Sequence, residues 1–267
     1  MSDLLWVVLS CALLGCLVGF LAGLLGIGGG LIIVPFLSAI LVHFNLVAFD
    51  QVMVIAIATS LASIIFTSSS SAIAHHKHNN IPRDITPWIM GGVAVGALIS
   101  GFIAGSIPSK ILKIIFAICV TFIALRMLIN SKQKTHRKLP KKPVLTAMTA
   151  SLGGLSGLLG IGGGALLVPL LTHFSVNMKK AIGCSAACGI VIAIFGTFGY
   201  VSSGWSVTQV NQGFVGYVYL PALLAIVSTS AIFAQLGAKA TQHFPVKIIK
   251  KIFAVILSII AVRMLLV

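Results

Sequence analysis

The chain has 267 residues, of which 58% are hydrophobic and 8% are charged, and its mean hydropathy is +1.14. Soluble domains average about a quarter charged residues, so this composition excludes the soluble classes and predicts an all-α polytopic membrane protein. The net charge of +15 comes from basic residues that lie between apolar segments, which favours topology signals at the membrane surface over nucleic-acid binding.

Ten apolar segments follow one another along the chain. They cover residues 4–25, 31–44, 52–74, 86–106, 109–129, 144–160, 165–176, 181–202, 214–236 and 247–266. Most are long enough to cross a hydrocarbon core of about 30 Å at about 1.5 Å per residue. The segments 31–44 and 165–176 are too short, since 14 residues give only about 21 Å of helix. We expect each of these two to be a half-helix, a re-entrant piece or a strongly tilted span.

The chain is a tandem repeat. Residues 23–30, with the sequence GLLGIGGG, recur letter for letter at 157–164. A Val-Pro pair follows each copy, at residues 34–35 and 168–169. The predicted organisation is a first transmembrane repeat over residues 1–130, a basic cytoplasmic linker over 131–143 and a second transmembrane repeat over 144–267.

The basic residues distinguish parallel from inverted repeats. If each glycine-broken segment crosses the membrane once, there are eight segments and the basic residues divide 10 to 8 between the two sides. If the chain reverses at each glycine run, there are ten segments and the division is 15 to 3, with Lys110, Lys113 and Arg263 in the minority. The positive-inside rule favours the second arrangement, so we predict inverted repeats with both termini outside.

The glycine runs predict an anion site. Glycine is costly in an apolar segment unless the backbone bends or is approached closely, and bare backbone at membrane depth is tolerated only where it is buried or lines a cavity. The helix after each run begins with free N–H groups and a partial positive charge. The alternative is that the glycines are packing faces for crossing helices, but their duplication favours a site. The predicted substrate-binding glycines are Gly28, Gly29, Gly30, Gly162, Gly163 and Gly164, and the predicted hinges are Gly26, Pro35, Gly160 and Pro169.

The acidic residues support an anionic cargo, because the chain has no Glu and its three Asp lie away from the middle of any apolar segment. Cation and proton carriers usually place a carboxylate inside the membrane. Hydroxyl groups would assist the glycines: Thr59 and Ser60 occupy the same place in the first repeat as Cys184 and Ser185 in the second. These four are predicted to contribute to the substrate site, although a serine or threonine bonded within its own helix is the common alternative.

Each of the remaining groups of polar residues has two possible roles. The hydroxyl run 67–71 and the patch 228–230 with Gln235 either line the pathway or join helices, and we favour the second. His43 and His173, one short helix beyond each Val-Pro pair, are candidates for proton coupling or rings at the polar boundary.

One catalytic pattern competes with these interpretations. Residues 154–157, GLSG, fit the GxSG pattern of intramembrane serine proteases. The first repeat has Ala22 at the position of Ser156, so the serine is not part of the repeated design. We therefore expect no enzyme activity.

The doubled GLLGIGGGxxxVP motif, the later A-x-x-x-S segment and the closing RML of each half resemble the sulfite exporter TauE/SafE family of membrane permeases. The resemblance covers nearly the whole chain. It implies a carrier in the bacterial inner (plasma) membrane for small sulfur-containing anions such as sulfite or sulfonates. The motif falls on Gly26, Gly28 to Gly30 and Pro35, and on Gly160, Gly162 to Gly164 and Pro169. Cys184 stands where the first half has Thr59, so the two half-sites differ chemically.

The sequence thus predicts a multi-pass secondary transporter that moves a small anion by alternating access. Its energy would come from an ion gradient, with a proton or sodium as the coupling ion, from the membrane potential or from the gradient of the substrate itself. It has no nucleotide-binding, cofactor or metal motif. The alternatives are an anion channel and, less favoured, an intramembrane serine hydrolase.

Overall fold

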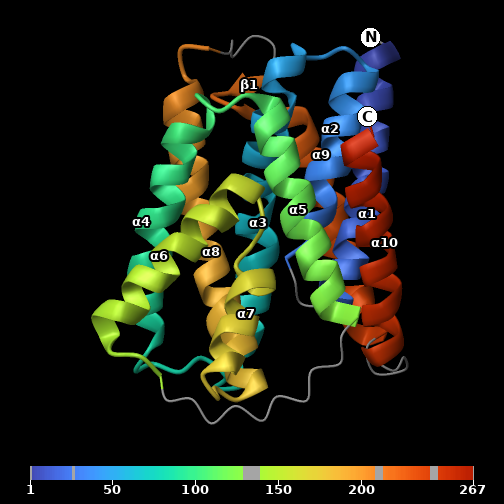
Figure 1. Ribbon diagram of the computed structural model, residues 1–267. Coiled ribbons are helices and arrows are strands. Elements are labelled where there is room, and N and C mark those ends of the chain that lie inside the picture. The colour runs from blue at the N-terminus through green and yellow to red at the C-terminus, as the bar shows by residue number, and fades with distance from the viewer. Residues whose placement is uncertain (1, 26–27, 129–138, 208–212, 241–245, 267) are drawn as a thin grey trace.

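A computed structural model describes residues 2–25, 28–128, 139–207, 213–240 and 246–266 (Figure 1). Its first helices are α1 (Ser2–Leu25), α2 (Gly30–His43), the 3-10 helix η1 (Phe49–Gln51), α3 (Val52–Lys77), α4 (Thr86–Ala104) and α5 (Ser109–Leu128). The remaining elements are α6 (Lys142–Leu159), α7 (Gly164–His173), α8 (Met178–Gly204), β1 (Phe214–Val215), β2 (Val218–Tyr219), α9 (Leu220–Ala240) and α10 (Val246–Leu266). The predicted all-helical fold is confirmed.

A small hairpin replaces the start of the ninth predicted segment. Phe214 pairs with Tyr219 and Val215 with Val218, in antiparallel register. Gly216 turns the chain between the strands with a φ of 54°. The helix begins only at Leu220, where Pro221 follows at a position that needs no N–H donor. The prediction of one continuous segment over 214–236 was wrong at this end.

Five helices in the described ranges are long and apolar enough to cross a membrane, namely α1, α3, α4, α8 and α9. The chain is therefore a multi-pass membrane protein. Helices α2 and α7 have only 14 and 10 residues. These lengths correspond to about 21 and 15 Å, which is less than a hydrocarbon core of about 30 Å. Both helices are short, as expected, and whether each is a half-helix, a re-entrant piece or a strongly tilted span stays a prediction.

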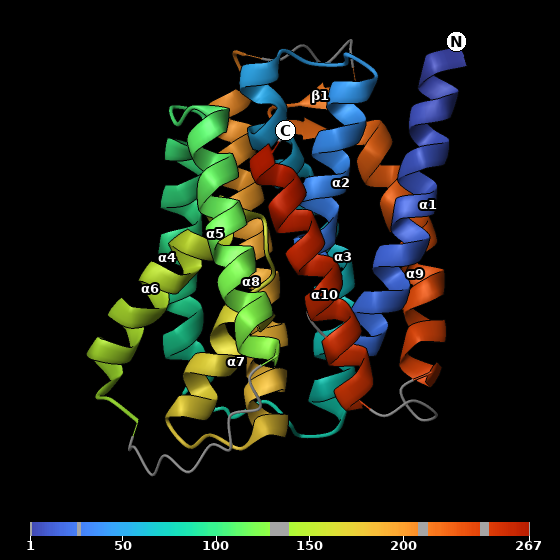
Figure 2. The same ribbon diagram turned by 45° about the vertical axis from the view of Figure 1, so that its right-hand side comes forward.

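The two short helices lie at opposite ends of the bundle (Figures 1 and 2). Both chain termini lie at the upper end in Figure 1, and α1 descends from there before α2 returns toward the same end. Helix α6 rises from the lower end to the middle of the bundle, and α7 returns to the lower end. We call these the termini end and the linker end, because α5 ends and α6 begins at the lower one.

The main packed helix pairs stay the same when α1–α5 are exchanged in order with α6–α10. Helix α1 packs against α9, as α6 packs against α4. Helix α2 packs against α3, as α7 packs against α8. The exchange leaves the pairs α3–α8 and α5–α10 unchanged, because each joins two equivalent helices. Helix α3 lies at the centre, where residues 52–64 are all buried.

Small residues allow the paired helices to approach closely. A Cβ added to Gly96 of α4 would overlap the carbonyl oxygen of Ala150 on α6, and one added to Gly19 of α1 would overlap Ser230 of α9. In lipid, helix association depends on van der Waals packing, because the acyl chains are as apolar as the side chains. These glycines therefore determine how tightly the bundle closes.

We expect Gly96→Val to destabilise the protein in detergent by about 1–3 kcal/mol, because a β-branched side chain overpacks the α4–α6 contact. Gly91 on the same helix is the matched control, since a Cβ there would have no atom within 4 Å. The thermal unfolding midpoints of both variants provide the measurement. Equal midpoints would show that the α4–α6 spacing is not set by Gly96.

Candidate functional site

The two glycine breaks meet inside the bundle. A Cβ on Gly28 would lie 3.8 Å from the Cα of Gly162 and 3.8 Å from the Oγ of Ser68. A Cβ on Gly30 would overlap the carbonyl oxygen of Gly160. Equivalent segments of the two sequence repeats are therefore in contact, and at Gly30 the Gly160 carbonyl leaves no room for a side chain.

Each break is built from a backbone conformation that favours glycine. Gly28 and Gly29 have φ values of 78° and 77°, and the Gly29 carbonyl accepts the first hydrogen bonds of α2 from Ile32 and Ile33. Gly160 ends α6 with a φ of 63°. An L-residue pays a steric penalty in this left-handed region.

The other predicted hinges have different positions. Gly26 lies outside the described residues. Pro35 and Pro169 lie inside α2 and α7, beyond the breaks themselves. A proline inside a helix removes one backbone hydrogen bond and favours a kink. Whether these residues act as hinges stays a prediction.

A cavity of about 400 Å³ adjoins the two breaks. Its glycine lining consists of Gly28, Gly162, Gly164 and Gly189. Its polar side chains are Thr67, Ser68, Ser70, Ser71, His75, Ser185, Ser230 and Gln235. They come from the second half of α3, the first half of α8 and the second half of α9, so the cavity extends from the breaks toward the linker end. No carboxylate is among the described residues that line it.

Hydrogen-bond donors without acceptors face this region. Within the described part of the chain, the backbone N–H groups of the lining residues Gly162 and Gly164, at the start of α7, have no backbone acceptor. The Oγ of Ser185 is fully buried and also lacks a hydrogen-bond partner among the residues that the structure describes. A buried polar atom left unpaired costs about 1–3 kcal/mol, so a ligand that accepts hydrogen bonds would be stabilised here.

Some predicted substrate residues line the cavity and others support it. Gly28, Gly162, Gly164 and Ser185 belong to the lining. The remaining predicted glycines pack behind it: Gly29 against Val18, Gly30 against Ile64 and Gly160, and Gly163 against Leu167 and Ile192.

Thr59, Ser60 and Cys184 lie outside the lining and make contacts within the protein. The Tyr219 N–H donates to Thr59 Oγ1 at 3.0 Å, and Ser60 Oγ donates to the Gly160 carbonyl at 2.8 Å. Thr86 Oγ1 donates to the Sγ of Cys184 at 3.3 Å. The first two contacts lie on the termini side of the breaks. Ser60 and Ser185 therefore have different environments although they occupy matching sequence positions.

The hydroxyl run on α3 was predicted to join helices, but most of its residues line the cavity. Ser68, Ser71 and His75 follow a spacing of three to four residues, which places them on one face of a helix. That spacing was the available signal, and the structure places all three in the cavity lining. The patch on α9 divides: Ser230 lines the cavity, whereas Thr229 Oγ1 donates to the Ala12 carbonyl at 2.9 Å and so joins α9 to α1.

The predicted histidine pair lies away from this cavity. His43 ends α2 and His173 ends α7, at opposite ends of the bundle. Each ring makes an edge contact with the phenylalanine that follows it, with centroids 5.0 and 5.4 Å apart. His75 is the histidine of the lining, and its Nδ1 lies 3.5 Å from Nδ2 of Asn80.

Ser156 lacks the surroundings of a nucleophile. Its Oγ is fully buried and has no hydrogen-bond partner in the described ranges. An activated serine needs a base within hydrogen-bond reach. The geometry at Ser156 gives no support to hydrolase chemistry.

The family model and the relatives that match this chain both describe membrane transporters. The sequence model of the family "Sulfite exporter TauE/SafE" matches residues 11–264. A "Probable membrane transporter protein" of Haemophilus influenzae is 39% identical over 97% of this chain and 98% of its own length. The "Probable membrane transporter protein MJ0441" of Methanocaldococcus jannaschii is 30% identical over 95% and 94% of the two chains. No solved structure gives a significant match.

These matches cover nearly the full length of both this chain and its relatives, and they include both glycine breaks. The chain therefore belongs to the sulfite exporter TauE/SafE family of membrane transporters.

Proposed function

We propose that this protein is a secondary transporter that moves a small sulfur-containing anion, such as sulfite or an organosulfonate, across the bacterial inner membrane by alternating access. The observation that carries the proposal is the cavity at the two glycine breaks, where unpaired donors face a space without described carboxylates. The family name supports the substrate class, and the relatives' names support transport.

The donor set favours an oxyanion over a cation. The start of α7 contributes backbone N–H groups and the positive end of a helix dipole, and Ser185 contributes a hydroxyl. Sulfite and sulfonate groups present three acceptor oxygens that such donors can share. A metal cation would find neither carboxylates nor another charge to balance its own in this lining.

Inverted repeats are part of this proposal. The exchange of packed helix pairs between α1–α5 and α6–α10 supports two related halves. The opposite placement of α2 and α7 in Figure 1 supports an inverted relation between them. Two halves of this kind can exchange conformations, so that one site opens to each side in turn.

The described conformation then faces the linker end. Among the described residues, this end carries Lys77, Arg83, Lys142, Lys179 and Lys180, and the positive-inside rule therefore assigns it to the cytoplasm. The route to the termini end is closed by the bond from Ser60 to Gly160 and by the bond from Tyr219 to Thr59. Ser185, at the position that matches Ser60, has no partner in the described chain. We infer that opening to the outside requires the Ser60–Gly160 bond to break.

An anion channel is the alternative, and counterflow distinguishes the two. In proteoliposomes preloaded with unlabelled sulfite, a carrier accumulates radiolabelled sulfite transiently, because each conformational exchange carries anions in both directions. We expect a saturable overshoot whose size changes with an imposed proton or sodium gradient. A flux that is linear in sulfite concentration and shows no overshoot would contradict the carrier proposal.

Ser185→Ala should raise the KM for sulfite about tenfold or more, because a hydrogen bond to a charged group contributes about 1.5–3 kcal/mol. Thermal stability should be unchanged or slightly higher, since the hydroxyl has no partner in the protein. Ser156→Ala is the matched control, because it removes another buried, unpaired hydroxyl away from the cavity. An unchanged KM in Ser185→Ala, or lost transport in Ser156→Ala with intact folding, would contradict this assignment.

Cysteine labelling tests the sidedness of the cavity. In a background without the five native cysteines, Ser71→Cys should react with a membrane-impermeant maleimide in inside-out vesicles, and an organosulfonate such as sulfoacetate, which does not itself consume the maleimide, should slow the reaction. Ser106→Cys, at an exposed position between α4 and α5 at the termini end, should react in right-side-out vesicles and serve as the control. Labelling of both positions from the same side would exclude the proposed orientation.

A further inference from the structure

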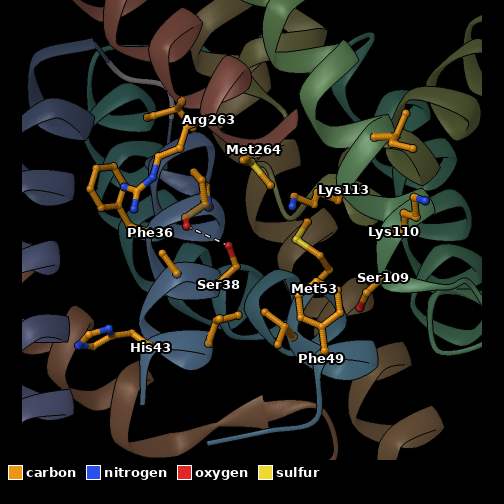
Figure 3. A pocket seen from close by; sticks show the side chains of 16 residues that line it. Phe36, Ser38, His43, Phe49, Met53, Ser109, Lys110, Lys113, Arg263 and Met264 are labelled. Carbon is orange, nitrogen blue, oxygen red and sulfur yellow. Dashed lines mark hydrogen bonds between the residues drawn. The ribbon is translucent and has the colours of Figure 1, made fainter. Parts of the chain in front are cut away.

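A second and larger cavity, of about 700 Å³, lies near the termini end and takes no part in the proposed transport site. It is enclosed by α2, the start of α3, the start of α5 and the end of α10. Figure 3 shows Arg263 on the α10 side and Lys110 and Lys113 on the α5 side, with Ser38 and Met53 between them.

The three cations of this cavity have no internal counter-charge. None of them forms an ion pair within the described ranges, and no carboxylate is among the described lining residues. The nearby Ser109 hydroxyl is already engaged, because it donates to the Asp50 carbonyl at 2.6 Å. The cavity therefore has three basic side chains on opposite sides of its lining and no described carboxylate to balance them.

The position of the two lysines at a helix N-terminus raises the electrostatic free energy of the cavity further. Lys110 and Lys113 occupy the start of α5, which begins at Ser109. A helix N-terminus carries a partial positive charge, so cations there are unfavourable unless an anion is bound. Lys110, Lys113 and Arg263 are also the three basic residues that the predicted topology leaves on the side of the membrane away from the cytoplasm, against the positive-inside rule.

The remaining walls are apolar and partly exposed. Phe49 is 61% exposed and Ile114 is 41% exposed, and Phe36 lies at the same cavity. A space of this volume corresponds to a drug-sized ligand and is much larger than a sulfite ion requires. Cationic groups beside exposed apolar walls match an amphiphile with an anionic head.

We propose that this cavity binds the headgroup of an anionic phospholipid from the leaflet at the termini end. Lys110, Lys113 and Arg263 hold the phosphate oxygens, and the acyl chains lie along the apolar walls formed by residues such as Ile114. The lipid links α5 to α10 and to α2. A basic pocket between membrane helices is a recognised form of lipid headgroup site, and here the cations come from equivalent helices of the two sequence repeats.

Native mass spectrometry of the full chain in detergent tests the proposal, with phosphatidylglycerol and phosphatidylcholine of identical acyl chains as probes. We expect the wild type to retain phosphatidylglycerol preferentially. The variant Lys110→Gln/Lys113→Gln/Arg263→Gln should bind it about a hundredfold more weakly, at about fivefold per cation. The control Arg83→Gln/Lys179→Gln/Lys180→Gln changes the net charge equally with exposed residues at the linker end and should bind normally.

Equal retention of the two lipids by the wild type would overturn the proposal even if the triple variant failed to fold. Equal loss of binding in the triple variant and in the control would also overturn it. In a further arm, inorganic phosphate and sulfite are added without lipid. Suppose that the triple variant loses binding of phosphate or sulfite but keeps binding of phosphatidylglycerol. The cavity is then a vestibule for soluble anions, and the lipid assignment fails.

Discussion

Direct backbone contact between the two glycine breaks is the constraint on which the rest of the structure depends. Polar backbone groups at membrane depth must be paired, buried or placed beside a cavity. Here Gly30 lies against the Gly160 carbonyl, and Gly28 lies against Gly162. A Cβ at Gly30 would force the breaks apart, and the donors at the start of α7 would lose their common cavity.

The same contact gives the structure its asymmetry. On the termini side, the Gly160 carbonyl accepts a hydrogen bond from Ser60, and the hairpin residue Tyr219 donates to Thr59. On the linker side, Ser185 remains unpaired among the described residues and the cavity opens. Two chemically related half-sites in different environments are what one conformation of an alternating-access carrier requires. In the proposed cycle, the free energy of the Ser60 bond contributes to the balance between the two conformations.

The two proposed anion sites differ in their charge. At the breaks, backbone dipoles and hydroxyls supply donors without a formal charge, which suits the proposed transport of a small anion that must bind and then be released. At the termini end, Lys110, Lys113 and Arg263 supply full charges beside exposed apolar walls. The stronger field suits a ligand that stays bound, such as the proposed lipid, and the weaker one suits a transported ion.

The sequence by itself determined the membrane class, the ten helical segments and the two short ones, because hydropathy and segment length act locally. It also identified the glycine runs, because an exact duplication is visible without a structure. It did not show that Ser60 bonds to Gly160 while Ser185 stays unpaired, since both serines have similar sequence surroundings. Nor did it place Ser68, Ser71 and Gln235 in the cavity or the turn residues before α9 in a hairpin. Those features depend on which distant helices meet, and only the tertiary packing of α3, α8 and α9 decided them.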